Sequence, residues 1–210
     1  LAEILVNYAI DVQPGDWVVV NSHVLALPLL HEVTRRIVRA GGNPMAVLNE
    51  NQLSEILLRE ATDAQLQWIS PLEQLTLEKA DALIILNASD NTRTLSGVDP
   101  QRQQVQQRAR AALMETYMRR SAEGSLRWVL TQYPCPAFAQ EADMSLGEYE
   151  AFVYGATFAD QPDPVQAWRQ VYDRQQRWIE WMQGRQQMVI KGANAEMSLS
   201  IAGRNFINDY

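Results

Sequence analysis

Cysteine, histidine and lysine are scarce in this sequence of 210 residues. The single cysteine, Cys135, cannot form an internal disulfide or a zinc site built from several thiolates. The only two histidines are His23 and His31, so a metal bound by this chain would depend mostly on carboxylates, which show no convincing clustered spacing. The sequence therefore indicates no catalytic residue and no metal ligand, and it leaves the substrate-binding residues unknown.

Long apolar runs and excess positive charge are also absent. No window approaches eighteen consecutive apolar residues, and Glu3 and Asp11 stand where a secretory signal would carry basic residues. The net charge of −7 disfavours a broad nucleic-acid interface, which requires clustered lysine and arginine. We therefore expect a cytoplasmic protein with neither a membrane nor a nucleic acid as partner.

The sequence does contain alternating strand and helix patterns, and its 47% hydrophobic content is enough to bury a core. Apolar runs, the clearest of them Trp17 to Val20, predict strands that helices cover on both faces, as in parallel sheets. Four strands are expected, at residues 17–20, 44–49, 82–86 and 128–131. The predicted fold class is α/β, with a mainly parallel sheet flanked by helices.

The helices are predicted from apolar periodicity and from their end signals. Gly41 and Gly42 stop one helix, and two capping boxes begin others, one at Thr62 and one at Ser145. The expected helical ranges are 2–10, 27–40, 53–60, 62–68, 71–79, 101–120, 146–158 and a long helix that starts at residue 164.

The last strands have a different pattern. Met197, Leu199 and Ile201 alternate with small or polar residues, which predicts an antiparallel strand pair with one exposed face. We expect an N-terminal α/β domain over residues 1–184. Residues 185–210 are expected to begin a C-terminal, metal-binding domain of which only the start is present.

Two motifs that suggest chemistry do not fit known sites. The turn after the first strand contains no glycine, so it cannot cradle a dinucleotide pyrophosphate. His31 and Glu32 begin a pattern like the zinc-binding H-E-x-x-H helix, but Arg35 occupies the position of the second histidine. Because a guanidinium cannot bind zinc, His31 is interpreted as a surface residue.

His23 and Cys135 leave two readings open. His23 follows a strand, where α/β folds place ligand-binding groups, but it also suits a loop histidine with local hydrogen bonds. Cys135 is either a thiol nucleophile activated by His23 or a small buried hydrophobic residue. The flanking Pro134 and Pro136 make a cis peptide bond before either proline a further expectation.

Three tryptophans, Trp168, Trp178 and Trp181, occur at helical spacing near the C-terminus. This spacing favours a core or helix-packing face over a substrate cage, with Trp181 as a candidate for an oligomer contact.

Three segments carry a family resemblance: P-x-P-A-x-A-Q-E-A at residues 134–142, M-S-L-x-E-Y-E at 144–150, and G-R-x-F-I-N at 203–208. In this order the chain resembles the amino-terminal domain of the thermophilic metalloprotease family, of the aminopeptidase T and aminopeptidase S type. Asp209 and Tyr210 depart from the family pattern. The resemblance implies a homodimeric hydrolase that removes N-terminal residues from peptides.

The resemblance also implies a centre of two divalent metal ions, of zinc, cobalt, manganese or magnesium. In the family, the first metal ligand is a glutamate in a Gly-Glu-Val-Phe-like motif that follows G-R-x-F-I-N, and no residue of this chain corresponds to it. We therefore expect the isolated chain to be inactive. The alternatives are a non-enzymatic α/β interaction or dimerisation module and, with less support, a thiol hydrolase built on Cys135.

Overall fold

The computed structural model describes residues 1–208, and their contacts divide the chain into two compact units, residues 1–160 and 161–210. Asp209 and Tyr210, where a departure from the family pattern is expected, lie outside the described residues. The division after Asp160 groups the last long helix with the terminal strand pair. The domain boundary near Gly184 stays a prediction.

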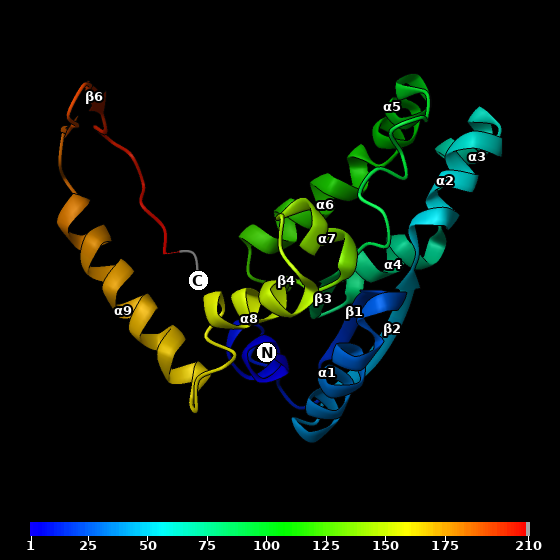
Figure 1. Cartoon of the computed structure of the whole chain (residues 1–210), viewed down its shortest axis with the longest axis horizontal. Coiled ribbons are helices and arrows are strands. Elements are labelled where there is room, and N and C mark those ends of the chain that lie inside the picture. Colours follow the sequence, from blue (N-terminus) through cyan, green and yellow to red (C-terminus); the bar gives the residue numbers. More distant parts are fainter. Residues whose placement is uncertain (209–210) are drawn as a thin grey trace. The chain divides into compact units, whose positions relative to one another are not determined.

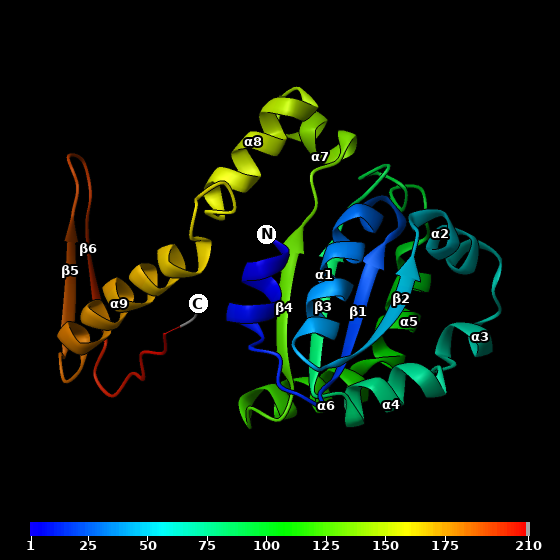
Figure 2. The same cartoon turned by 90° about the horizontal axis from the view of Figure 1, so that it is seen from below.

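A four-stranded parallel sheet forms the centre of the first unit (Figures 1 and 2). Its order is β2-β1-β3-β4, and each pairing is parallel. The strands are β1 (Trp17–His23), β2 (Asn43–Asn49), β3 (Ala82–Asn87) and β4 (Arg127–Gln132). The predicted α/β class is confirmed, and each predicted strand lies within the observed one.

Helices cover both faces of this sheet. On one face, the N-terminal π-helix η1 (Ile4–Ala9) and α1 (Leu27–Arg39) pack on apolar residues such as Val18, Val20 and Ile84. On the other face, Leu77 of α4 (Pro71–Lys79) and Tyr117 of α6 (Ala111–Ala122) join a second cluster. Because adjacent residues of a strand point to opposite faces, the continuous apolar runs of β1 and β3 supply both clusters.

The predicted end of α1 is confirmed. Gly41 has a φ of +86°, its N–H donates to the Val38 carbonyl, and the Gly42 N–H donates to the Ile37 carbonyl. This pair of bonds is a Schellman motif, which requires a left-handed residue where glycine has no steric cost. It turns the chain directly into β2.

The remaining helices of the first unit lie in the segments that connect or follow the strands. Both predicted capping boxes are present, at Thr62 before α3 and at Ser145 before α8. The further helices are η2 (Val24–Ala26), α2 (Asn51–Glu60), α3 (Asp63–Gln67), α5 (Pro100–Ala109), α7 (Pro136–Glu141) and α8 (Leu146–Ala156).

Two expectations need correction. The single helix predicted over residues 101–120 is two helices, α5 and α6, which meet at Arg110, where ψ is 0°. The Arg110 guanidinium lies 3.3 Å from a carboxylate oxygen of Glu73 in α4, a tertiary contact that no local pattern signals. No peptide bond among the described residues is cis, so both Pro134 and Pro136 follow trans bonds.

The second unit contains the long helix α9 (Pro164–Met182) and an antiparallel pair, β5 (Gln187–Lys191) and β6 (Glu196–Ser200). Asp163 caps α9 by accepting a hydrogen bond from the Gln166 N–H. The predicted antiparallel pair is confirmed, with Met188 opposite Leu199 and Ile190 opposite Met197. No helix among residues 1–208 is both long and apolar enough to cross a membrane.

Candidate functional site

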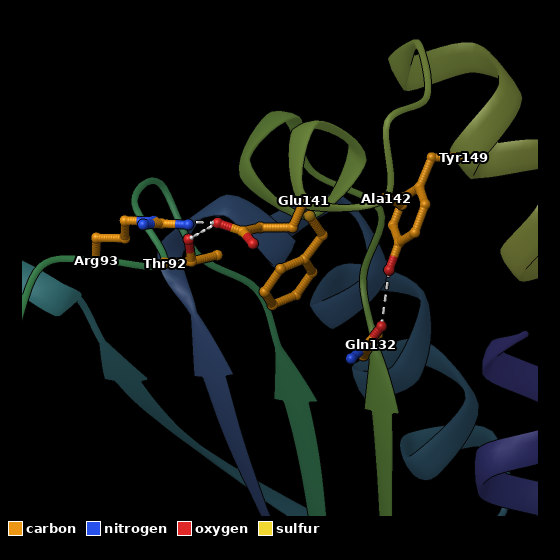
Figure 3. A pocket seen from close by; sticks show the side chains of 7 residues that line it. Thr92, Arg93, Gln132, Glu141, Ala142 and Tyr149 are labelled. Carbon is orange, nitrogen blue, oxygen red and sulfur yellow. Dashed lines mark hydrogen bonds and ion pairs between the residues drawn. The ribbon is translucent and has the colours of Figure 1, made fainter.

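The carboxyl ends of the sheet strands carry a cavity of the first unit. In open α/β sheets this edge is where ligands bind, because loops can vary there without disturbing the strands. A cavity of about 510 Å³ opens beside the segments that follow β3 and β4. Its lining residues are Thr92, Arg93, Gln132, Phe138, Glu141, Ala142 and Tyr149. Figure 3 shows these side chains above the ends of the strands.

An ion pair forms one side of this cavity. The Arg93 Nε lies 3.5 Å from Oε1 of Glu141, and the Thr92 hydroxyl donates to the same oxygen at 2.7 Å (Figure 3). The hydrogen bond from Thr92, together with the positive charge of Arg93, lowers the pKa of Glu141. The carboxylate therefore stays ionised at neutral pH.

A tyrosine and an amide form the opposite side. The Tyr149 hydroxyl donates to Oε1 of Gln132 at 2.8 Å (Figure 3), and burial raises the pKa of this phenol. Tyr149 reaches the cavity because the Ser145 capping box starts α8, and because Tyr149 and Val153 pack on Ala139 of α7. The local signal at Ser145 thus determines where this ring lies.

A second cavity of about 360 Å³ adjoins the first, since both are lined by Thr92 and Phe138. Its wall is rich in amides and hydroxyls from the segment after β3 and from the start of α2. The additional lining residues are Asn51, Ser54, Asn87, Ala88, Ser89, Asn91, Thr94 and Leu95. The amide of Asn51 donates to Asp90 at 3.1 Å and to Ser89, which ties α2 to the loop after β3.

The residues singled out from the sequence lie elsewhere. His23 ends β1 and is buried, and its Nδ1 accepts a hydrogen bond from the Leu25 N–H at 3.2 Å. Its Nε2 has no hydrogen-bond partner among the described residues. His31 is exposed on α1, where Glu32 and Arg35 form an ion pair. His23 makes the expected local hydrogen bond, but it lies in the strand and not in the loop after it. The exposure of His31 agrees with its interpretation as a surface residue.

Cys135 is buried, and its Sγ accepts a hydrogen bond from the Ser89 N–H at 3.5 Å. It belongs to the hydrophobic cluster beneath α1, which agrees with the reading of a small buried hydrophobic residue. Because neither Cys135 nor His23 hydrogen bonds to the other within residues 1–208, the structure does not assemble the thiol–histidine pair.

Of the two alternatives for these tryptophans, the core is wrong for Trp178 and Trp181, whereas a helix-packing face and an oligomer contact at Trp181 stay predictions. Trp178 and Trp181 are exposed on α9, where their rings meet edge to face with centroids 6.1 Å apart. The guanidinium of Arg185 lies over the Trp181 ring at 5.0 Å. The two rings and the Arg185 guanidinium thus stabilise one another on an exposed helix face.

None of the cavity residues was singled out from the sequence as a site residue. The available signal was positional: the loop after β3 and the P-x-P-A-x-A-Q-E-A segment after β4 both follow buried strands. Parallel strands bring their carboxyl ends to one edge, so Thr92 and Glu141, 49 residues apart in the chain, meet there.

No three His, Cys, Asp or Glu side chains among residues 1–208 come together as a metal site. The described residues therefore do not match the three or more protein ligands that a catalytic metal requires. We assign no metal-dependent step to them.

Comparison with known proteins gives consistent results. The chain is 25% identical over 195 residues to Aminopeptidase 2 of Geobacillus stearothermophilus, covering 88% of this chain and 47% of that protein. It is 22% identical over 179 residues to Aminopeptidase T of Thermus thermophilus, covering 80% of this chain and 44% of the relative. The chain thus spans about half the length of these curated relatives.

A solved structure, wild-type AmpT from Thermus thermophilus, shares the fold. The TM-score is 0.74 at 18% identity, and the superposition covers 95% of this chain and 52% of the AmpT chain. The family model described as thermophilic metalloprotease (M29) matches residues 1–209, nearly the whole chain. The chain therefore belongs to the thermophilic metalloprotease (M29) family.

Proposed function

We propose that this chain is the N-terminal part of a metal-dependent aminopeptidase that removes N-terminal residues from peptides. The observation that carries the proposal is the family match over residues 1–209, together with the aminopeptidase names of both curated relatives. Since the chain spans about half of those relatives, the proposal concerns a longer enzyme of which these residues are one portion. A cytoplasmic location is part of the same proposal.

The chain's role in this enzyme is structural. Peptide hydrolysis by a metal-bound hydroxide requires several protein ligands and an open coordination position. We propose that these ligands, for two divalent ions such as zinc, cobalt, manganese or magnesium, belong to a domain that begins at residues 185–210 and continues beyond them. The α/β domain then supplies a wall of the substrate cleft and supports a homodimer.

Activity assays on two proteins test this division. The first protein is the 210-residue chain, and the second is the same chain with its C-terminal continuation to the length of the relatives. Each is assayed on leucine p-nitroanilide with each of the four metals, and bound metal is measured by mass spectrometry after dialysis. We expect hydrolysis and bound metal only for the longer protein. Hydrolysis by the 210-residue chain alone would contradict the division.

A second candidate function, a non-enzymatic dimerisation module, is favoured by the exposed Trp178–Trp181 pair. Aromatic side chains are enriched at the centres of protein interfaces. Light scattering on the 210-residue chain, with and without the Trp178→Ala and Trp181→Ala changes, tests it. A concentration-dependent dimer that both changes abolish would support the module, and a monomer at all concentrations would exclude it.

A further inference from the structure

The cavity after β3 and β4 contains hydrogen-bonding capacity that the protein itself does not use. Arg93 comes nearest to Glu141 through Nε, at 3.5 Å, and its two terminal nitrogens donate no hydrogen bond to residues 1–208. Its side chain is 78% exposed, so these nitrogens are accessible. A guanidinium presents such donors as a rigid fork that matches the two oxygens of a carboxylate.

One carboxylate oxygen of Glu141 also has no hydrogen-bond partner among the described residues. Its Oε1 accepts from Thr92 and lies beside Arg93, whereas its Oε2 has no partner within the described part of the chain. The hydrogen bond from Thr92 and the charge of Arg93 lower the pKa of this carboxyl, so it is ionised at neutral pH. Oε2 can therefore accept a hydrogen bond from an ammonium or an amide N–H next to the bound carboxylate.

The opposite wall offers an apolar surface and one further donor. Phe138 and the ring of Tyr149 line the cavity, and the Tyr149 hydroxyl donates a hydrogen bond to Oε1 of Gln132. This hydrogen bond orients the Gln132 amide so that its nitrogen, which has no partner among residues 1–208, remains a donor. The cavity of about 510 Å³ is shallow and open to solvent, so a bound ligand would stay partly exposed.

The charges in the cavity indicate which class of ligand fits it. One guanidinium and one carboxylate lie side by side, so their charges cancel. A phosphate with two negative charges would be repelled by Glu141 more strongly than a carboxylate with one, and no glycine among the lining residues lets a backbone approach it closely. A carboxylate with a nitrogen on the adjacent carbon, by contrast, matches both charged groups.

We propose that this cavity binds the free α-carboxylate end of an amino acid or peptide. The carboxylate binds the terminal nitrogens of Arg93, the nitrogen of the same residue donates to Glu141, and the apolar side chain lies against Phe138 and Tyr149. The two sources of this chemistry are a free amino acid, whose nitrogen is an ammonium, and the C-terminal residue of a peptide, whose nitrogen is an amide.

Nuclear magnetic resonance titration of the 210-residue chain, without added metal, tests the proposal with three probes: leucine, N-acetyl-leucine and leucinamide. We expect leucinamide, which lacks the carboxylate, to bind at least about tenfold more weakly than the better of the other two. Binding of leucine alone identifies the free amino acid as ligand, and similar binding of N-acetyl-leucine identifies the peptide terminus. Equal binding of leucinamide, or no binding of any probe, would overturn the proposal.

Two variants locate the site. Arg93→Gln removes the fork and is expected to weaken carboxylate binding about tenfold or more, while Arg93→Lys retains the charge and weakens it less. Glu141→Gln is expected to weaken leucine more than N-acetyl-leucine, because only the ammonium needs the negative charge. The matched control is Arg119→Gln, which breaks another solvent-exposed ion pair, between Arg119 of α6 and Glu123 just after that helix. Unchanged binding by Arg93→Gln, in a chain that keeps its circular dichroism, would also refute the site.

The choice of leucine as probe rests on the proposed aminopeptidase function, but the binding measurement does not. It uses the metal-free chain, whereas the proposed function is tested by hydrolysis in the longer protein. If the metal-free chain binds no probe but the longer protein hydrolyses the substrate, only the binding proposal has failed. If the chain binds the probes but the longer protein is inactive, only the proposed function has failed.

Discussion

The two units of the molecule differ in how much they bury. Each of the four hydrophobic clusters formed by described residues lies within the first 160 residues. In residues 161–208, by contrast, the buried side chains are those of Pro164, Ile179 and Ile201. Every residue of β6 is exposed, as are most of those in β5.

This difference shows that a unit can form regular helices and strands without burying enough area to be stable by itself. The first unit has a sheet with apolar residues on both faces, which is the arrangement that provides a cooperative core. The second unit has regular secondary structure but little buried area, and a two-stranded pair alone is marginally stable in water. We therefore expect the first unit to dominate the unfolding transition of the chain.

The largest expected effect comes from truncating an isoleucine in each unit. Ile84 in β3 is fully buried, so Ile84→Ala is expected to lower the free energy of unfolding by about 2–5 kcal/mol. Ile190 in β5 is 47% exposed, so Ile190→Ala is expected to cost less than about 1 kcal/mol. Urea unfolding followed by circular dichroism measures both. Similar losses would mean that the strand pair shares the cooperative core.

A smaller effect is expected from adding a methyl group at a glycine. A Cβ at Gly42 would lie 2.8 Å from Val12 Cγ1 and 3.0 Å from Ile37 Cγ2, so Gly42→Ala should cost about 1–3 kcal/mol. At Gly192, between β5 and β6, the nearest atom would be 3.6 Å away, and Gly192→Ala should change stability by less than about 0.5 kcal/mol. Calorimetry measures the melting temperatures of both variants. Equal shifts would contradict the prediction that Gly42 is tightly packed and Gly192 is not.

The smallest effect concerns helix caps. Ser145→Ala removes the capping box of α8 and should cost about 0.5–2 kcal/mol in the main transition. Asp163→Ala removes the cap of α9, and we expect it to reduce helical signal without shifting that transition. Circular dichroism during thermal unfolding separates the outcomes. A shift of the main transition by Asp163→Ala would show that α9 unfolds together with the sheet.

Glu148 provides an independent readout of the first cap. Its hydrogen bonds with Ser145 lower the pKa of Glu148 below its ordinary value of 4.5. A carboxyl with a lowered folded-state pKa stabilises the fold above that ordinary value, and the contribution is lost as the pH falls through the folded-state pKa. Ser145→Ala should therefore raise the pKa of Glu148 toward 4.5, as measured by carboxyl resonances. An unchanged pKa would show that the Ser145 hydroxyl does not lower it and would leave that effect to the Ser145 backbone N–H, which the variant retains.

The sequence predicted elements wherever the determining contacts are local. Gly41 permits the left-handed end of α1, and Ser145 and Glu148 form their capping box within four residues. The buried strands were equally predictable, because a strand covered on both faces is apolar throughout. The α/β class was predictable as well, because strand and helix patterns alternate along the sequence.

The break at Arg110 was not predictable in this way, because its contact with Glu73 joins residues 37 apart in the chain. The exposure of Trp178 and Trp181 also contradicts the core position inferred from their periodicity, since periodicity shows which face is apolar but not whether anything covers it. Both corrections concern what packs against a helix.

By itself, then, the sequence determined the secondary structure, the parallel sheet and the family resemblance, since these depend on spacing and short-range hydrogen bonds. Only the tertiary structure decided that Arg93, Glu141, Gln132 and Tyr149 line one cavity. They come from segments after different strands, and their meeting depends on the pairing of β3 with β4 and on the packing of α8 against α7. The physical reason is that long-range packing, which no local pattern encodes, sets the distances between these side chains.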